Sequence, residues 1–191
     1  MAKATKSRSS DQSIDAIELL KQDHRAVEAL FEEFEEAEDE QLAAIAERVC
    51  QLLTVHAQIE EELLYPAAKE AFKDEEENDL VNEATVEHAS ARELIAQIED
   101  MSADDELFKA TVKVLSEYIK HHVKEEEGEM FPKLKETELD LEELGGRLQD
   151  RKLALMEEVG IEPEEDEGSR KHTRAAAPTS NGARTGRASR Q

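Results

Sequence analysis

Four segments of the chain carry apolar residues at the spacing of an amphipathic helix. Positions three or four residues apart share one face of a helix, so each segment predicts a helix with one buried side. The four stripes run through Ile17, Leu20, Val27, Phe31 and Phe34; through Ile45, Val49, Leu52 and Leu63; through Val81, Ala84, Ala91, Ile95 and Ile98; and through Leu107, Val114, Leu115 and Tyr118. Because short connections join the segments, the predicted fold is all-α, an antiparallel up-down-up-down four-helix bundle over residues 13–136.

Three further segments flank the predicted bundle. Residues 137–160 predict an accessory helix, interrupted at Gly145 and Gly146, that packs across the bundle. Residues 1–12 are small, polar and basic, and residues 161–191 are first acidic and then rich in Ala, Arg, Ser, Thr and Gly. Such compositions bury too little apolar surface to fold, so both tails are expected to be disordered.

The composition narrows the class of protein. Charged residues make up 38% of the chain, aromatic residues 4%, and Trp is absent, which favours helices over sheets. Cys50 is the single cysteine, which excludes a disulfide framework and favours a reducing compartment. No apolar run approaches the length of a membrane span, and the N-terminus lacks the apolar stretch of a signal peptide. We therefore expect a cytoplasmic monomer with no membrane partner.

The formal net charge of −24 is unevenly distributed. Residues 13–168 hold 47 of the 48 acidic residues but only 15 of the 24 Lys and Arg residues. This acidic body should repel nucleic acid, as well as anionic membranes. Only the basic tails could attract a nucleic acid or an acidic partner.

Each predicted helix carries one histidine within its apolar stripe, namely His24, His56, His88 and His122. Successive histidines are 32, 32 and 34 residues apart, about the length of a helix and its turn, so they return to a similar height in the bundle. Glu60 and Glu126 follow two of these histidines by four residues, one turn further on the same face. The pattern predicts that four imidazoles and two carboxylates converge in one interior.

The two His-x3-Glu pairs lie in a repeated phrase. In both copies an aromatic residue and a proline, Pro66 or Pro132, follow the histidine by nine and ten residues, and each proline should kink or loosen its helix. A charged Glu in a core is costly unless it is paired or bound to metal. Two cations bridged by the carboxylates would offset that cost. Imidazole and carboxylate ligands without thiolates favour iron or manganese over structural zinc.

These motifs resemble the hemerythrin-like family, the HHE cation-binding domains. The resemblance covers roughly Ile14 to Lys135, and its carriers are Asp23-His24, His56-x3-Glu60 with Leu64-Tyr65-Pro66, Glu87-His88, and His122-x3-Glu126 with Met130-Phe131-Pro132. It implies two Fe ions in an oxo- or hydroxo-bridged di-iron centre inside the bundle. By this resemblance the terminal ligands are His24, His56, His88 and His122, and the bridges are Glu60 and Glu126.

The chain departs from the classical oxygen-carrying members at two positions. Those proteins place a second His one turn before the third-helix ligand, where this chain has Ala84. One iron would then have one fewer protein ligand, and a water, an exogenous ligand or another Glu would fill the position. An open coordination position suits reactivity toward peroxide or nitric oxide. In the classical proteins the last carboxylate ligand is also spaced differently from its histidine than Glu126 is from His122 in this chain. Glu127 is therefore an alternative to Glu126.

Residues around the predicted ligands receive separate interpretations. Tyr118 lies one turn before His122 on the same stripe and is a candidate second-shell residue, as is Glu127. His121 points about 100° away from His122 and is predicted to be exposed. The remaining predictions are solvated side chains for Glu61, Glu62, Glu125 and Glu129, and packing beside the prolines for Tyr65 and Phe131.

The leading functional hypothesis is a non-haem di-iron protein that binds or reacts with dioxygen, peroxide or nitric oxide, in oxygen sensing or stress defence. Peroxide decomposition and nitric oxide handling are the enzymatic possibilities. The alternatives are an iron storage or delivery protein and a metal-free helical interaction module that works through its basic tail. A ferritin-like carboxylate site uses Glu three residues before His. Here Leu53, Thr85 and Ile119 occupy those positions, which argues against it.

Overall fold

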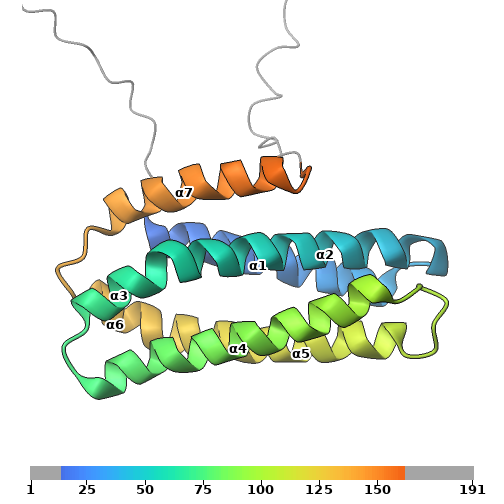
Figure 1. Ribbon diagram of the computed structural model, residues 1–191, viewed down its shortest axis with the longest axis horizontal. Coiled ribbons are helices and arrows are strands. Elements are labelled where there is room, and N and C mark those ends of the chain that lie inside the picture. Colours follow the sequence, from blue (N-terminus) through green and yellow to red (C-terminus); the bar gives the residue numbers. More distant parts are fainter. Residues whose placement is uncertain (1–13, 162–191) are drawn as a thin grey trace, which may run out of the picture. The chain divides into compact units, whose positions relative to one another are not determined.

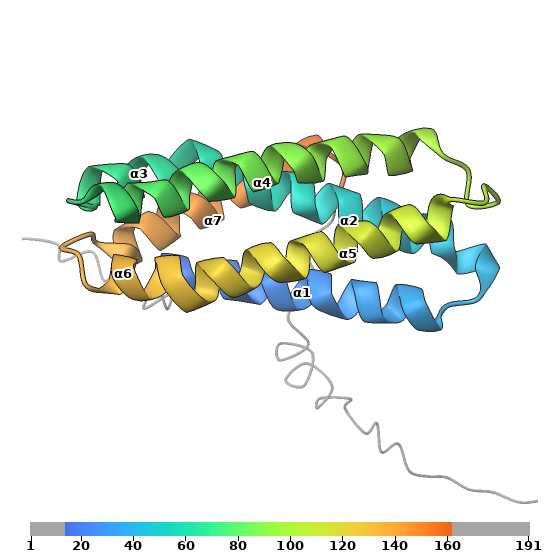
Figure 2. The same cartoon turned by 90° about the horizontal axis from the view of Figure 1, so that it is seen from below.

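A computed structural model describes residues 14–161, and these form an antiparallel four-helix bundle with one further helix (Figures 1 and 2). The tails predicted to be disordered, residues 1–12 and 162–191, lie outside the described residues. The bundle helices are α1 (Ala16–Glu36), α2 (Asp39–Ile59) continued by η1 (Glu60–Leu64) and α3 (Tyr65–Ala71), α4 (Glu75–Asp100), and α5 (Phe108–Glu125) continued by η2 (Glu126–Met130) and α6 (Phe131–Lys135).

Capping residues fix where several helices begin. Asp15 accepts a hydrogen bond from the Glu18 N–H at the start of α1. Glu38 and Gln41 form a reciprocal capping box at the start of α2. These side chains satisfy backbone N–H groups that the first turn of a helix leaves without partners. No helix within residues 14–161 combines the length and apolar character needed to cross a membrane.

The four histidines that were predicted as metal ligands lie between two apolar clusters of the core. One cluster joins the start of α1 to α3, α6 and the first half of α4. The other joins the second half of α1 to the first half of α2, the second half of α4 and most of α5. Each of the four histidines lies where its helix passes from one cluster to the other, and all four are buried. The bundle therefore holds a polar layer between two apolar ones.

Two residues of the fourth predicted stripe do not belong to the core. Leu107 and Val114 are 62% and 50% exposed. Phe108, Val112 and Ile119 are buried in their place. Leu107 precedes α5, which begins one residue later. Leu115 of the same stripe is fully buried, so the prediction was wrong only at Leu107 and Val114.

The fifth helix, α7 (Leu141–Glu158), packs lengthwise on α1 and α2 (Figure 1). It runs without a break through Gly145 and Gly146, so the interruption predicted there is wrong. Gly145 is buried against the start of α1, and a Cβ atom there would lie 2.2 Å from the backbone oxygen of Ile14. Ile161, predicted to begin the disordered tail, is only 5% exposed and packs into the core.

We expect Gly145→Ala to loosen the packing of α7, because the added methyl group meets backbone atoms that cannot move aside. The cost of such overpacking is roughly 1–3 kcal/mol of unfolding free energy. Gly146→Ala is the matched control, because a Cβ at that position meets nothing within 4 Å. There the better helix propensity of Ala should stabilise the protein by up to about 1 kcal/mol. Urea unfolding curves that shift equally for the two variants would contradict this packing.

Candidate metal centre

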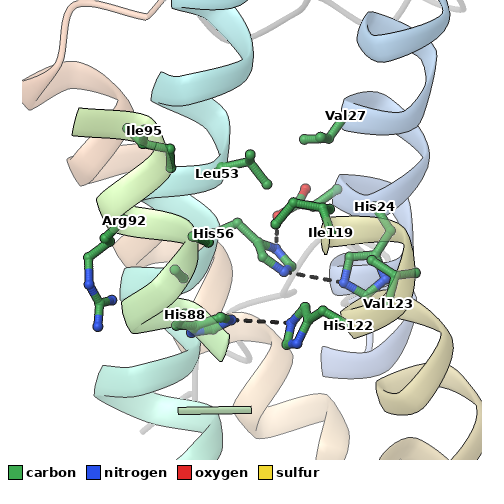
Figure 3. Close-up of a pocket in the computed structure, with 13 residues that line it drawn as sticks. His24, Val27, Leu53, His56, His88, Arg92, Ile95, Ile119, His122 and Val123 are labelled. Atoms are coloured by element: carbon green, nitrogen blue, oxygen red, sulfur yellow. Dashed lines mark hydrogen bonds and ion pairs between the residues drawn. The ribbon is translucent and has the colours of Figure 1, made fainter. Parts of the chain in front are cut away.

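Four histidine side chains meet in two pairs inside the bundle (Figure 3). His24 on α1 and His56 on α2 place their Nε2 atoms 3.2 Å apart. His88 on α4 and His122 on α5 do the same, also at 3.2 Å. Each pair therefore comes from one pair of helices adjacent in the sequence.

Two buried carboxylates link the histidine pairs. The Oε2 atom of Glu60 lies 3.2 Å from Nε2 of His56 and 3.3 Å from Nε2 of His88. The Oε2 atom of Glu126 lies 3.4 Å from Nε2 of His24 and 3.6 Å from Nε2 of His122. Each carboxylate thus contacts one histidine of each pair. The structure brings together all six residues predicted as metal ligands.

Glu60 and Glu126 each begin a π-helical segment. The N–H of Tyr65 donates to the carbonyl of Glu60, five residues earlier, and the N–H of Phe131 donates in the same way to the carbonyl of Glu126. The prolines that follow have no N–H to donate, which accommodates the change of hydrogen-bond register. The loosening predicted at these prolines takes the form of a π turn. Wide turns of this kind often occur at functional sites.

Every histidine of the centre faces a carboxylate with its second ring nitrogen. The distances from Nδ1 to the carboxylate oxygen are 2.9 Å for His24 and Glu127, 3.0 Å for His88 and Glu61, 2.7 Å for His122 and Glu87, and 3.6 Å for His56 and Asp23. A carboxylate can only accept a hydrogen bond, so at His24, His88 and His122 it favours the proton on Nδ1 and leaves the lone pair on Nε2. The 3.6 Å separation at His56 is an ion-pair distance and not a hydrogen bond. The four Nε2 atoms are therefore oriented inward as potential metal ligands.

Three of these backing carboxylates are in turn paired with a Lys or Arg side chain. The pairs are Glu127 with Arg25, Glu61 with Arg92, and Asp23 with Lys152 of α7. The fourth, Glu87, lies 3.8 Å from the exposed His121, which is too far for a hydrogen bond. The contacts with Lys and Arg hold the first three carboxylates and, through them, the imidazole rings.

Glu127 and Tyr118, the two candidate second-shell residues, lie in different surroundings. Glu127 contacts Nδ1 of His24 and therefore backs a histidine, whereas Glu126, 1% exposed, enters the interior. The structure thus places Glu126, not Glu127, among the convergent residues. Tyr118 is half-buried and packs against the apolar cluster formed by the second half of α1 and most of α5.

The tyrosine hydroxyl that reaches the centre belongs to Tyr65, which the sequence had assigned to packing. It lies 3.2 Å from Nε2 of His88 and 3.2 Å from Oε1 of Glu126. Burial, together with the charges of Glu60 and Glu126, raises the pKa of Tyr65 well above its usual value, so the phenol keeps its proton. Phe131, the equivalent residue of the second repeat, stacks on His24 with ring centroids 6.0 Å apart.

The buried charges shift the pKa values of the centre. Burial disfavours the charged form of His122, but Glu126, Glu87 and Glu60 outweigh it and raise the pKa of His122 to about 9. Burial likewise opposes a charge on His24, and Glu126 together with Glu60 raises its pKa. Without a metal, protons on these imidazoles compensate the carboxylates.

The donor set fits bound cations. Both oxygens of Glu60 and the Oε2 of Glu126 are buried without a hydrogen-bond partner. Buried carboxylate oxygens are normally satisfied by hydrogen bonds or by metal ions. Two groups of potential ligand atoms, each within 4.8 Å of one another, share Glu60: one adds His24, His56 and Glu126, and the other adds His88 and His122.

A small apolar cavity lies over the histidines (Figure 3). Its volume is about 20 Å³. Its apolar lining is formed by Val27, Leu53, Ala91, Ile95 and Ile119, while His24, His56, His88 and His122 lie at its polar end. A cavity of about 10–15 Å³ holds one water molecule, so this one accepts a molecule of only a few atoms.

The fold and the buried donors define a four-helix bundle built around a candidate cation centre. The chain belongs to the hemerythrin HHE cation-binding domain family, whose model matches residues 15–134. This confirms the family that the motifs resemble. Metal-cation binding is the property that the family and the His and Glu clusters share.

Two similar proteins are instructive. A hemerythrin HHE cation-binding domain-containing protein from Mycobacterium kansasii, a homologue of Rv2633c, superimposes with a TM-score of 0.66 at 23% identity. The match covers 76% of this chain and 89% of that one, and it confirms the predicted fold. A curated relative from Nostoc sp. (strain PCC 7120), named DNA nickase, is 28% identical over 124 residues, which are 64% of this chain and 34% of the relative. The chain therefore spans about a third of that protein's length.

The sequence interpretation overlooked three of the four backing carboxylates. Glu61 was predicted to be solvated, and Asp23 and Glu87 were given no role of their own. A signal was present, because Asp23 and Glu87 directly precede a histidine, and Glu61 and Glu127 directly follow Glu60 and Glu126. The duplicated positions thus mark the backing carboxylates as well as the inner ligands.

We expect metal binding at pH 7 to release protons. The pKa of His122 is about 9 in the metal-free protein, so its imidazole is charged at pH 7 and must lose a proton before Nε2 binds a cation. Affinity should rise as the pH approaches 9. The proton on His122 stabilises the metal-free fold below about pH 6.5, and this contribution is lost as the pH rises through 9.

Calorimetric titration of ferrous ion, without oxygen and in two buffers of different ionisation enthalpy, measures the number of protons released. Equal heats in the two buffers at pH 7 would contradict a charged His122. The Lys120→Ala protein is a control, because this exposed residue lies on α5 outside the centre.

Proposed function

We propose that this chain is a non-haem di-iron protein that binds or reacts with a small oxidant: dioxygen, peroxide or nitric oxide. The observation that carries the proposal is the pair of buried carboxylates with unpartnered oxygens between two histidine pairs. In this assignment His24 and His56 would hold one ion, His88 and His122 would hold the other, and Glu60 and Glu126 would be shared between the two. Imidazole and carboxylate donors without thiolate suit iron, and the bound pair would supply redox chemistry with oxygen species.

The inner nitrogens support the presence of cations. When Nδ1 of His88 and Nδ1 of His122 each donate to their carboxylates, the two Nε2 lone pairs face each other at 3.2 Å. The Nε2 atoms of His24 and His56 lie at the same distance. Such lone pairs repel unless a proton or a cation lies beside them. Two divalent cations would more than offset the two negative charges of Glu60 and Glu126.

The cavity supports a small uncharged or weakly polar ligand. Its apolar lining excludes ordinary charged metabolites, which lose hydration there without gaining a partner. Leu53, Ile95 and Ile119 narrow the space above the imidazoles. A diatomic gas or a peroxide is small enough for this volume.

Two features on the side of His88 and His122 favour a reaction with the bound oxidant over reversible oxygen carriage. Ala84 leaves one protein ligand fewer than in a classical carrier. Tyr65 holds a proton within hydrogen-bond distance of His88 and Glu126. A retained phenolic proton beside the centre is suited to hydrogen-bonding or protonating a bound oxidant.

The setting of this function is also a proposal. We expect a cytoplasmic monomer whose partner is the small oxidant itself, and we expect contact with nucleic acid only through the basic tail, which lies outside the described residues. Iron storage or delivery is the second candidate. It would use the same six ligands, but it would require iron to be exchanged and would have no need of the Tyr65 hydroxyl.

Purified protein reconstituted with ferrous iron should hold about two ions per chain, and the oxidised form should show oxo-bridge charge-transfer absorption. His56→Ala and His122→Ala should each reduce the content to about one ion or less, because each removes half of an imidazole pair. Metal analysis and absorption spectra test this directly. Lys120→Ala should keep both ions. Unchanged iron in both histidine variants would exclude this centre.

Tyr65→Phe should keep the fold and the iron content, because Phe131 already occupies the equivalent position of the other repeat. The rate of reaction with hydrogen peroxide should fall roughly 100-fold, the usual contribution of a positioned proton donor. Stopped-flow absorption of the iron-loaded protein measures it. Tyr118→Phe is the matched control, since Tyr118 packs in the apolar cluster beyond the histidines. Equal rates for the two variants would assign Tyr65 to packing alone.

A further inference from the structure

We propose that a surface site formed by Glu87, His121 and Glu125 binds a divalent cation such as ferrous ion and passes it to and from the buried centre. The inference rests on the proposed di-iron centre and adds the route by which its ions arrive. The four carboxylates that contact the Nδ1 atoms lie between the centre and the surface. They differ in the charged side chains that contact them from outside.

Three of the four approaches carry a permanent positive charge. The guanidinium of Arg25 lies 2.8 Å from Glu127, and that of Arg92 lies 2.6 Å from Glu61. The third of these approaches is covered by α7, where the ammonium group of Lys152 contacts Asp23. A fixed cation at each approach repels an incoming metal ion.

At the fourth approach, the carboxylate of Glu87 adjoins a histidine and a second carboxylate instead of a Lys or Arg side chain. His121, 60% exposed, places Nε2 3.2 Å from Oε1 of Glu125 and 3.8 Å from Oε1 of Glu87. Together the three side chains offer one nitrogen and two carboxylate oxygens within 4.8 Å of one another. This mixed donor set suits a divalent cation that retains water ligands.

Glu87 connects the surface group with the interior. Its Oε1 faces His121, while its Oε2 lies 2.7 Å from Nδ1 of His122. One carboxylate thus contacts an exposed imidazole with one oxygen and a histidine of the centre with the other.

A separate cavity of about 10 Å³ lies beside this group and is lined by two of its members, Glu87 and Glu125. Glu83, Glu87 and Glu125 line its acidic part, and Ala84, His122 and Glu126 line its inner part. Glu126 is 1% exposed, and its Oε2 has no hydrogen-bond partner. The small side chain of Ala84 leaves this space open, where the classical carriers have a second histidine. The cavity therefore joins an exposed donor set to a buried carboxylate that lacks a partner.

The test compares the kinetics of metal exchange with the metal content at equilibrium. The double variant His121→Ala/Glu125→Gln removes two surface donors and no residue of the centre. Ferrous ion is added without oxygen to metal-free full-length protein, and bound metal is followed by stopped flow. Release is measured by adding a chelator to the loaded protein. Both rates should fall about tenfold, the lower range of electrostatic steering, while the final content stays the same.

Charge reversal sharpens the comparison. Glu125→Lys places a permanent cation at this approach and should slow loading further, with a weaker dependence on salt. Glu129→Gln is the matched control, since this exposed residue makes the same neutralising change one turn further on and does not line the cavity. Circular dichroism verifies that each variant is folded.

The outcomes separate the route from the centre. Slower exchange at unchanged content supports the surface site. Equal exchange rates for the double variant and Glu129→Gln, with full metal content, overturn the route and leave the di-iron centre intact. A lower final content in the double variant also overturns it, because the surface group would then belong to the centre. A native chain that takes up no iron overturns the proposed function and the route together.

Discussion

The burial of two charged carboxylates is the constraint on which the rest of this structure depends. Glu60 and Glu126 are 0% and 1% exposed in the middle of a helical bundle. An ionised carboxylate in such a place is strongly unfavourable unless positive charge and ligands surround it. The histidine pairs surround both carboxylates with ring nitrogens, and the raised pKa values of His24 and His122 let these two imidazoles carry positive charge beside them. The apolar clusters on either side exclude water and strengthen every electrostatic interaction between them.

The centre is nearly two-fold symmetric, and its differences are informative. In each half the residue before the first histidine contacts the second histidine, and the residue after the buried glutamate contacts a histidine of the other half. Symmetry fails at Tyr65 and Phe131, where only the first has a hydroxyl group. It fails again at Asp23 and Glu87, where Lys152 covers the first and the exposed His121 adjoins the second. The side of His88 and His122 thus has the tyrosine hydroxyl, and its outer carboxylate adjoins a histidine instead of a lysine.

The sequence predicts the fold and the six inner residues because both follow from the same spacing of three to four residues, which places side chains on one face of a helix. Histidines at intervals of 32, 32 and 34 residues must return to one level once the stripes form helices. Tyr65 shows where that period fails. A regular helix places it about 140° away from Glu60, whereas the π turn makes residues five apart successive neighbours along the helix. The pairing of Glu61 with His88 joins separate helices and depends on their relative rotation, which no local spacing encodes.

The accessory helix shows how residues beyond the matched domain contribute to the centre. Residues 15–134 match the family, whereas α7 begins at Leu141. Yet Lys152 contacts Asp23, and Arg151 lies 2.6 Å from Glu62, two residues after the buried Glu60. Arg151 lowers the pKa of Glu62 to about 2, although the exposure of this pair limits what it adds to stability. The helix therefore acts mainly through packing and through Lys152, which fixes one backing carboxylate and closes that side of the centre. Buried negative charge in a bundle is stabilised by cations held at its edges, and at Glu87 the exposed His121 takes the place that a Lys or Arg side chain has at the other three carboxylates.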